Sequence, residues 1–213
     1  MGSGWEQVTV KIAVFGATGG TGAQVVEQAL DAGHQVTAVA RRTGAFAAHD
    51  RLRVIVGSVD ELAVVDNAVQ GQDGVISALG SDRRGVTTVC TDAIRSVLVA
   101  MREHGVNRLA VVIAYGAAET HDRSLYSTLL WAMKADSMRD KETMEALVRG
   151  SGLSWTIVRP TALTNGPRTG DYRTGTDLSI GLRSRIARAD VAAFLLRETT
   201  APAFTGLAPT ITG

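Results

Sequence analysis

The stretch Val8 to Gly22, VTVKIAVFGATGGTG, decides the fold. Its apolar, largely β-branched first half, ending at Phe15, predicts a buried parallel strand. The strand breaks into GATGGTG at 16–22, and an apolar pattern with helical spacing follows from Val25 to Leu30. In this order of elements the glycines let the backbone approach a phosphate, and the first N–H groups of the helix point at it. We therefore expect a dinucleotide site here, with glycines spaced G-x-x-G-x-x-G rather than the commoner G-x-G-x-x-G.

The composition bounds the class of protein. The chain has 213 residues, 45% of them hydrophobic, which suits one domain with a sizeable core. We expect a flexible leader at 1–7 and a single domain over 8–213 with a small C-terminal portion on the substrate side. The net charge of +1, from 22 basic and 21 acidic residues, gives no electrostatic reason to expect nucleic acid or a membrane surface as partner.

Cysteine and histidine usage limits the possibilities further. The one cysteine, Cys90, excludes an internal disulfide and fits a reducing compartment, so we expect a cytoplasmic protein. Cys90 falls on a helical apolar stripe, which favours a core thiol over a nucleophile. No His, Cys and Asp cluster has metal-ligand spacing, and we predict no metal. No apolar run approaches the ~20 residues that cross a bilayer.

Strand and helix patterns alternate along the rest of the chain. This alternation predicts an α/β fold, a single Rossmann-type doubly wound parallel sheet with helices on both faces. We expect further strands at 35–40, 52–56, 74–78, 108–114, 154–158 and 206–212. We expect further helices at 61–69 with Asp60 as N-cap, around 86–101, in parts of 123–149, and at 189–196.

Two arginines, Arg41 and Arg42, end the second expected strand about twenty residues after the glycine turn. The ribose of the adenosine lies at this place in such folds, where an acidic residue binds a 2′-hydroxyl. Two guanidinium groups suit a 2′-phosphate instead and favour NADP(H) over NAD(H). The alternative is that arginines simply terminate a strand at a solvated edge.

Motifs along nearly the whole chain carry a family resemblance. They are GATGGTG at 16–22, Arg41-Arg42, SALG at 77–80, KETMEALVRGSGL at 141–153, TIVRPTAL at 156–163 and RIARADVAAFLL at 185–196. With these motifs the chain resembles the atypical short-chain dehydrogenase/reductases, in particular the NAD(P)H-binding, NmrA-like group that includes biliverdin reductase B (flavin reductase). The resemblance implies an NADP(H)-binding protein that acts on a small molecule, as a monomer or small homo-oligomer.

The resemblance also implies a role for individual residues. Those expected around the pyrophosphate are Gly16, Thr18, Gly19, Gly20, Thr21 and Gly22, with Arg41 and Arg42 at the 2′-phosphate and Ser58 and Val59 near the adenine. Those expected around the nicotinamide are Leu79 and Gly80 on the ribose side and Pro160, Thr161 and Ala162 at the ring. Lys141 matches a basic position that reaches the ribose or the reacting centre.

The chain departs from the family's reductases at the catalytic positions. Those reductases use Tyr-x-x-x-Lys, in which lysine lowers the pKa of the phenol that protonates the substrate. Four residues after Tyr115, Tyr126 and Tyr172 this chain has Glu119, Leu130 and Thr176, and Ile113-Ala114 stands where relatives often have serine. A standard Ser-Tyr-Lys ketoreductase is therefore not expected.

Three accounts of function stay open on the sequence. The first is an NADPH-dependent reductase of flavin-like or quinone-like acceptors, which have less need for a positioned acid because solvent or substrate can supply the proton. In the second, Tyr115, Lys141 or a group at Ser81-Asp82 is the acid for a carbonyl or enone substrate, although Tyr115 could equally well pack under its loop. The third is an NADP(H)-binding redox sensor, or a non-redox cyclase or isomerase in a repurposed reductase pocket.

Overall fold

A computed structural model describes residues 9–80, 88–121 and 125–213. The leader expected at 1–7 and the loop at Ser81-Asp82 lie outside the described residues. The helices are α1 (Gly20–Asp31), α2 (Leu62–Val69), α3 (Val89–Glu103), α4 (Leu125–Arg149), α5 (Arg188–Thr200) and the 3₁₀ turn η1 (Ala118–Thr120). The strands are β1 (Lys11–Phe15), β2 (Gln35–Ala40), β3 (Leu52–Val56), β4 (Gly74–Ser77), β5 (Arg108–Val112), β6 (Ser154–Pro160), β7 (Ala162–Thr164), β8 (Arg173–Gly175), β9 (Arg185–Ala187) and β10 (Thr210–Thr212).

The central sheet has eight strands in the order β3-β2-β1-β4-β5-β6-β10-β8. All neighbouring pairs are parallel except β10 and β8, so the predicted parallel sheet is confirmed with one antiparallel strand at its edge. The strand order reverses between β1 and β4, and open parallel sheets bind ligands at the carboxyl ends of the strands at such a point. The glycine turn after β1 stands there.

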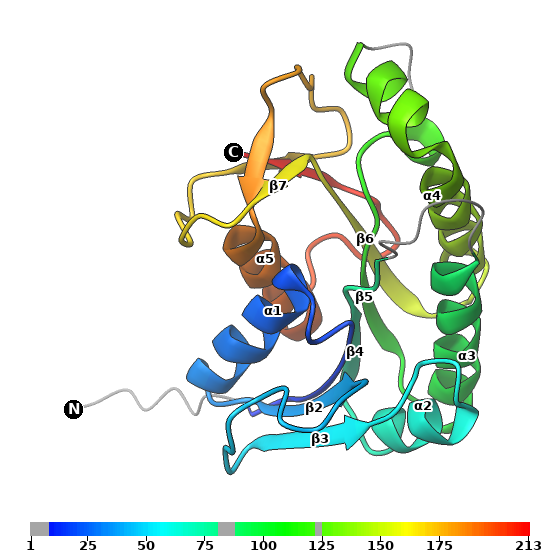
Figure 1. Ribbon diagram of the computed structural model, residues 1–213, viewed down its shortest axis with the longest axis vertical. Coiled ribbons are helices and arrows are strands. Elements are labelled where there is room, and N and C mark those ends of the chain that lie inside the picture. The colour runs from blue at the N-terminus through cyan, green and yellow to red at the C-terminus, as the bar shows by residue number, and fades with distance from the viewer. Residues whose placement is uncertain (1–8, 81–87, 122–124) are drawn as a thin grey trace.

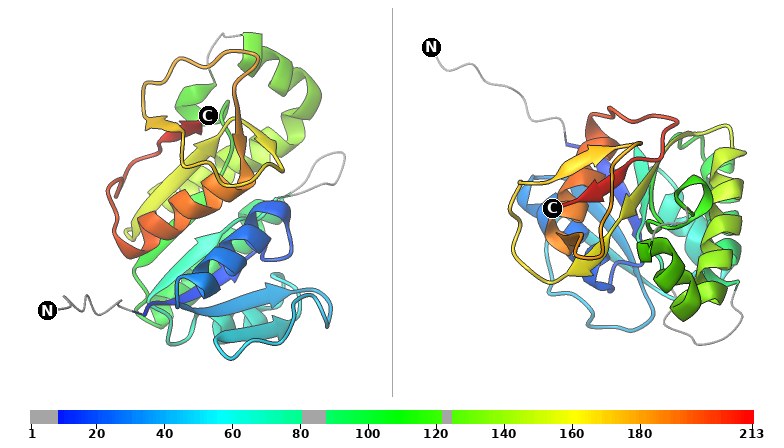
Figure 2. Two further views of the ribbon diagram at one scale, coloured as in Figure 1. Left: turned by 90° about the vertical axis from the view of Figure 1, so that its left-hand side faces the viewer. Right: turned by 90° about the horizontal axis from the view of Figure 1, so that it is seen from above.

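Helices cover both faces of the sheet, as predicted (Figure 1). On one face α1 packs against α5, and on the other α2 and α4 both pack against α3. A separate hydrophobic core lies between each helix layer and the sheet. Val25 and Phe194 belong to the core under α1 and α5, and Ile94 and Met144 belong to the core under α3 and α4. In the left view of Figure 2 the C-terminus, just after β10, lies in the upper part of the molecule, and β1 begins in the lower part.

A smaller unit stands over the carboxyl edge of the sheet. β7 and β9 form a two-stranded parallel sheet there, and the first part of α4 lies across from it (Figure 1). α4 is broken at Lys134, whose φ of −141° and ψ of 30° are not helical. That the C-terminal part of this unit lies on the substrate side stays a prediction.

The sequence prediction omits β7, β8 and β9, and the ends of several elements differ from it by a few residues. Two of these differences have a clear physical reason. Asp60 is not the N-cap of α2; Glu61 is, and its carboxylate accepts the N–H of Ser58 at 2.8 Å. The last strand covers only Thr210–Thr212, since Pro209 lacks an N–H and Gly206 turns the chain with a φ of +72°.

Candidate dinucleotide and acceptor site

The glycine turn leaves no room for side chains on its inner side. A Cβ added to Gly16 would lie 2.5 Å from the Ala78 carbonyl oxygen, and one added to Gly22 would lie 2.1 Å from the Gly16 carbonyl oxygen. Gly19 is the N-cap of α1 and donates its N–H to the Gly16 oxygen at 3.0 Å. The first N–H groups of α1 have no partner within the helix, so the turn presents donors to an anion at the carboxyl edge.

The other residues predicted around the pyrophosphate belong to the same turn. Thr18, Gly19 and Gly20 are exposed, whereas Thr21 and Gly22 are buried in the first turn of α1. Only the exposed backbone can face a ligand directly. The buried pair instead allows α1 to start against the end of β1.

Arg188, which sequence reasoning did not assign to the site, lies directly over Gly20. A Cβ on Gly20 would meet the Arg188 Nε at 2.8 Å, and the Arg188 Nη1 donates to Asn165 Oδ1 at 2.6 Å. Gly20, Asn165 and Arg188 line a cavity of about 250 Å³. Arg188 belongs to the RIARAD motif at 185–190, but its place over the glycine turn follows only from the packing of α5 against α1. A larger depression, about 360 Å³ around Lys11 and Gln35, lies at the opposite ends of the strands and contains no predicted site residue.

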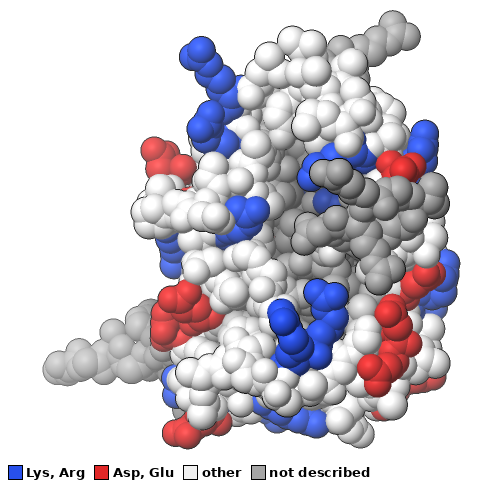
Figure 3. Space-filling model, viewed as in Figure 1, with Lys and Arg blue, Asp and Glu red and all other residues white. Residues whose placement is uncertain are grey.

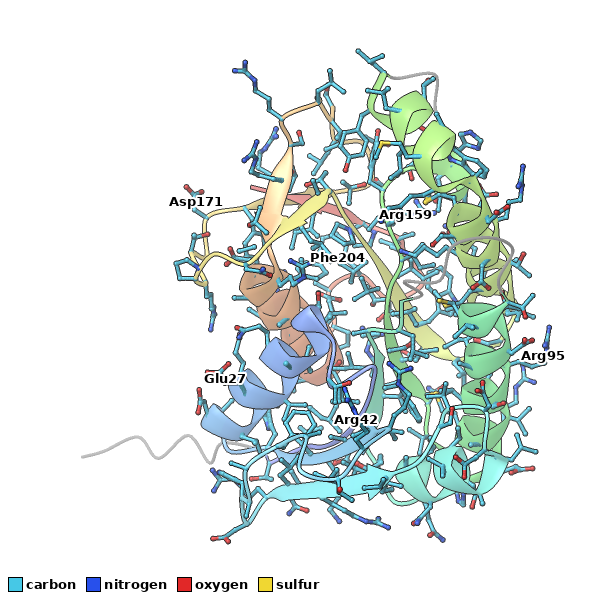
Figure 4. All side chains as sticks on the ribbon, viewed as in Figure 1. Glu27, Arg42, Arg95, Arg159, Asp171 and Phe204 are labelled. Carbon is cyan, nitrogen blue, oxygen red and sulfur yellow. The ribbon has the colours of Figure 1, made fainter. Side chains whose placement is uncertain are left out.

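Arg41 and Arg42 follow β2 at the carboxyl edge. Both are exposed, and within the described part of the chain neither guanidinium has an acidic partner. Figure 3 shows basic side chains on the lower rim of a hollow that crosses this face, and Figure 4 labels Arg42 in that region. These cations are available to a bound anion.

Ser58 and Val59 lie beside the arginines, because the Gly57 N–H donates to the Ala40 oxygen at 2.9 Å and joins the ends of β2 and β3. The Ser58 hydroxyl donates to Asp60 Oδ2 at 3.1 Å within its own loop. Val59 is half-buried and packs on the core. The structure therefore brings the residues predicted for the adenine next to those predicted for the 2′-phosphate.

The residues predicted on the nicotinamide side follow β4 and β6. Leu79 is half-buried, with its nitrogen 3.0 Å from the position of a Gly16 Cβ, and Gly80 is exposed. The Pro160 oxygen accepts the Tyr115 N–H at 3.1 Å. Thr161 is buried and its hydroxyl donates to Thr212 Oγ1 at 3.2 Å. Only Ala162 of the predicted trio is exposed.

Tyr115 and Lys141, the predicted catalytic pair, lie beneath this edge. Tyr115 is only 5% exposed. The Lys141 ammonium donates to the Ile113 oxygen at 3.2 Å, and burial lowers the pKa of this amine. A second tyrosine, Tyr126 from the first part of α4, packs edge-on against Tyr115 with 5.5 Å between ring centroids.

A buried ion network supports the turn that carries Tyr115. Arg159, which is 1% exposed, pairs with the fully buried Glu145 and donates to Glu119 Oε2 at 2.7 Å. Arg149 donates to the same two carboxylates at 2.8 and 2.7 Å. Figure 4 labels Arg159 between β6 and α4. Because a buried charge without its partner is costly, the network fixes β6, α4 and this turn in one arrangement.

Cys90 and His121, the other two residues weighed as candidates from the sequence, pack against neighbouring side chains. Cys90 is buried, and burial followed by the nearby Asp140 charge raises the pKa of its thiol to about 11, which agrees with a core thiol. His121 stacks on Trp131 with 4.0 Å between ring centroids. Across residues 9–80, 88–121 and 125–213, no group of three or more His, Cys, Asp or Glu could hold a metal, and no helix is long and apolar enough to cross a membrane.

Comparisons with known proteins agree with this geometry. A family model described as NAD(P)H-binding matches residues 16–202. Reductase pytE of Aspergillus terreus is 27% identical, covering 94% of this chain and 97% of its own. YwnB of Bacillus subtilis (strain 168) is also 27% identical, covering 91% and 93%. The structure of ChuY, an anaerobillin reductase from Escherichia coli O157:H7, has a TM-score of 0.80 at 26% identity and covers 94% of this chain and 96% of that one. The family model spans most of the chain, and the protein therefore belongs to the NAD(P)H-binding family, with a Rossmann-type fold.

Proposed function

We propose that the protein is an NADP(H)-dependent reductase of the atypical short-chain dehydrogenase/reductase type. Its acceptor would be a small planar molecule such as a flavin, a quinone, an enone or another conjugated carbonyl compound. The observation that carries the proposal is the glycine turn at the strand-order reversal. A Cβ atom added at Gly16 or Gly22 would clash with backbone carbonyl oxygens there, so only glycine lets the backbone approach this closely. A diphosphate fits such a cradle, with Arg188 above it as a further cation.

The preference for NADP(H) rests on Arg41 and Arg42. An acidic residue at this strand end would bind a ribose hydroxyl, whereas this chain offers two exposed guanidinium groups with no acidic partner in the described residues. Guanidinium groups bind phosphate through paired N–H donors. The 2′-phosphate of NADPH would supply the missing anion.

The class of acceptor follows from the nicotinamide side. When bound, the dinucleotide would supply a hydride there, and the chain's residues would hold the acceptor and exclude water. The Lys141 ammonium donates to the Ile113 oxygen at 3.2 Å, and the sequence has no Tyr-x-x-x-Lys motif that would pair this lysine with a tyrosine one helical turn earlier. Flavin-like and quinone-like acceptors need such a pair least. The reductase names of pytE and ChuY support reduction as the reaction class.

The proposal also covers the cellular compartment of the protein and the number of subunits that the site needs. We place it in the cytoplasm, because the one cysteine is a buried thiol. The proposed site draws on residues of one chain only, so it needs no second subunit.

The test begins with calorimetric titration of the purified protein by NADPH and by NADH. NADPH absorbance is then followed with a panel of flavins, quinones and enones. Tight NADPH binding with acceptor-dependent oxidation is the expected result. Tight binding without oxidation by any acceptor would refute the reductase and favour the sensor or the non-redox enzyme.

A further inference from the structure

Tyr126 stands at the place where an acceptor would meet the chain. It comes from the first part of α4, ahead of the break at Lys134. Its ring packs on Tyr115 at 5.5 Å, and the backbone amide of Ala162 faces its hydroxyl. Ala162 is the exposed member of the trio predicted to flank the nicotinamide. The Tyr126 hydroxyl therefore lies at the boundary between the proposed cofactor site and the smaller unit above it.

The two groups predicted from the sequence are less accessible than Tyr126. Tyr115 is 5% exposed and its ring contacts the Tyr126 ring edge-on, whereas Tyr126 is half-buried. The Lys141 ammonium is held on the Ile113 oxygen. A proton donor must reach the reacting atom within hydrogen-bond distance. Of these three groups, Tyr126 meets that requirement best.

A backbone amide also reaches the Tyr126 hydroxyl. Burial raises the pKa of this phenol, whereas the hydrogen bond from the Ala162 N–H acts in the opposite direction. That N–H would stabilise the phenolate left after proton transfer.

We propose that Tyr126 is the proton donor to the acceptor, with Tyr115 as the surface that holds its ring. The inference rests on the proposed function, which supplies the reduced dinucleotide. For an enone, hydride forms a C–H bond at the β-carbon and the π electrons move to the carbonyl oxygen. That oxygen takes the proton of the Tyr126 hydroxyl, giving an enol that becomes the ketone in water. The phenolate left behind recovers a proton from water, so charge and atoms balance.

The kinetic test compares Tyr126→Phe, Tyr115→Phe and Tyr172→Phe. Tyr172 is the matched control, because it packs on Phe194 in the other core layer, with 6.4 Å between ring centroids. With NADPH and 2-cyclohexenone, Tyr126→Phe should lower kcat at least tenfold, whereas Tyr172→Phe should not. With menadione, a quinone that needs less acid assistance, Tyr126→Phe should retain most of the wild-type rate.

A binding measurement gives a readout that needs no turnover. Carbonyl-labelled 2-cyclohexenone is bound to the protein with oxidised NADP⁺, and its infrared carbonyl stretch is recorded. A hydrogen bond from Tyr126 should shift the stretch to lower frequency in the wild type, and the shift should disappear only in Tyr126→Phe.

Different failures separate the inference from the proposed function. A wild type that binds NADPH but reduces no acceptor overturns both. A wild type that reduces enones, with Tyr126→Phe unaffected or with Tyr115→Phe alone losing the rate and the infrared shift, overturns only the assignment of Tyr126. Equal losses with enone and quinone in Tyr126→Phe also overturn it, because they indicate lost structure rather than a lost proton.

Discussion

Replacing Arg41 and Arg42 together by alanine tests the cofactor assignment most directly. Both guanidinium groups are exposed and have no acidic partner in the described residues, so their removal breaks no ion pair there. A hydrogen bond to a charged group contributes about 1.5–3 kcal/mol, and exposed groups belong at the low end. Two such contacts to a 2′-phosphate sum to about 3 kcal/mol. At 1.4 kcal/mol for each tenfold change, NADPH should bind roughly 100-fold more weakly.

The assay is calorimetric titration of both dinucleotides at one ionic strength, because salt screens exposed charges beyond about 8 Å at physiological concentration. NADH lacks the 2′-phosphate, so its affinity should change by less than about threefold. Arg53→Ala is the matched control, since Arg53 donates to Asn67 Oδ1 at 2.6 Å on the outer strand β3. Equal weakening of NADPH and NADH in the double variant would refute the reasoning, as would an NADPH-selective loss in the control.

Three further changes probe the glycine turn, Arg188 above it and the ion network around Arg159. Gly22→Ala should abolish calorimetric binding of both dinucleotides, because its Cβ would lie 2.1 Å from a carbonyl oxygen, whereas Gly181→Ala, with nothing within 4 Å, should not. Arg188→Ala should weaken NADPH and NADH alike by roughly tenfold in the same titration, and a change in preference would contradict its place over the pyrophosphate. The hydrogen bond from Arg159 is the main reason that the pKa of Glu119 is held at about 2. Since this pKa lies below the ordinary 4.5, Glu119 stabilises the fold above about pH 4.5 and loses the effect as the pH falls toward 2. In urea unfolding, the free energy of unfolding of Glu119→Gln should be about 1 kcal/mol lower than that of the wild type at pH 7, after allowance for solvent screening. The difference should shrink below pH 4.5. A difference that does not change with pH would exclude a contribution from the ion pair.

The sequence predicts the dinucleotide half well because its signals are local. β2 and β3 have the predicted bounds, since a short apolar run between turn residues is sufficient to define a strand. The glycine turn follows from spacing alone. The N-cap of α2 was predicted one residue too early. Asp60 is a residue type that commonly caps helices, but the structure starts α2 after Glu61, whose side chain accepts the Ser58 N–H and caps no helix N–H.

The acceptor half was less predictable because its contacts join distant segments. β7 and β9 are three residues each, too short to show an alternating pattern. Arg188 reaches the glycine turn, and Arg159 reaches Glu145, only once the helices have packed. No periodic pattern in the sequence predicts the contact of Arg188 with the glycine turn or of Arg159 with Glu145. The break at Lys134 likewise has no glycine or proline to mark it.

The break at Lys134 divides α4 into two parts whose residues can be substituted independently of one another. The part after Lys134 carries Met144 and Glu145, which the sheet and the ion network require. The part before it exposes Leu125, Leu129 and Met133 and lies across from the small sheet of β7 and β9. Under the proposed function, substitutions at these exposed positions would alter the surface offered to an acceptor without touching the glycine turn. A library randomised at these positions alone would then vary substrate choice and leave cofactor binding unchanged.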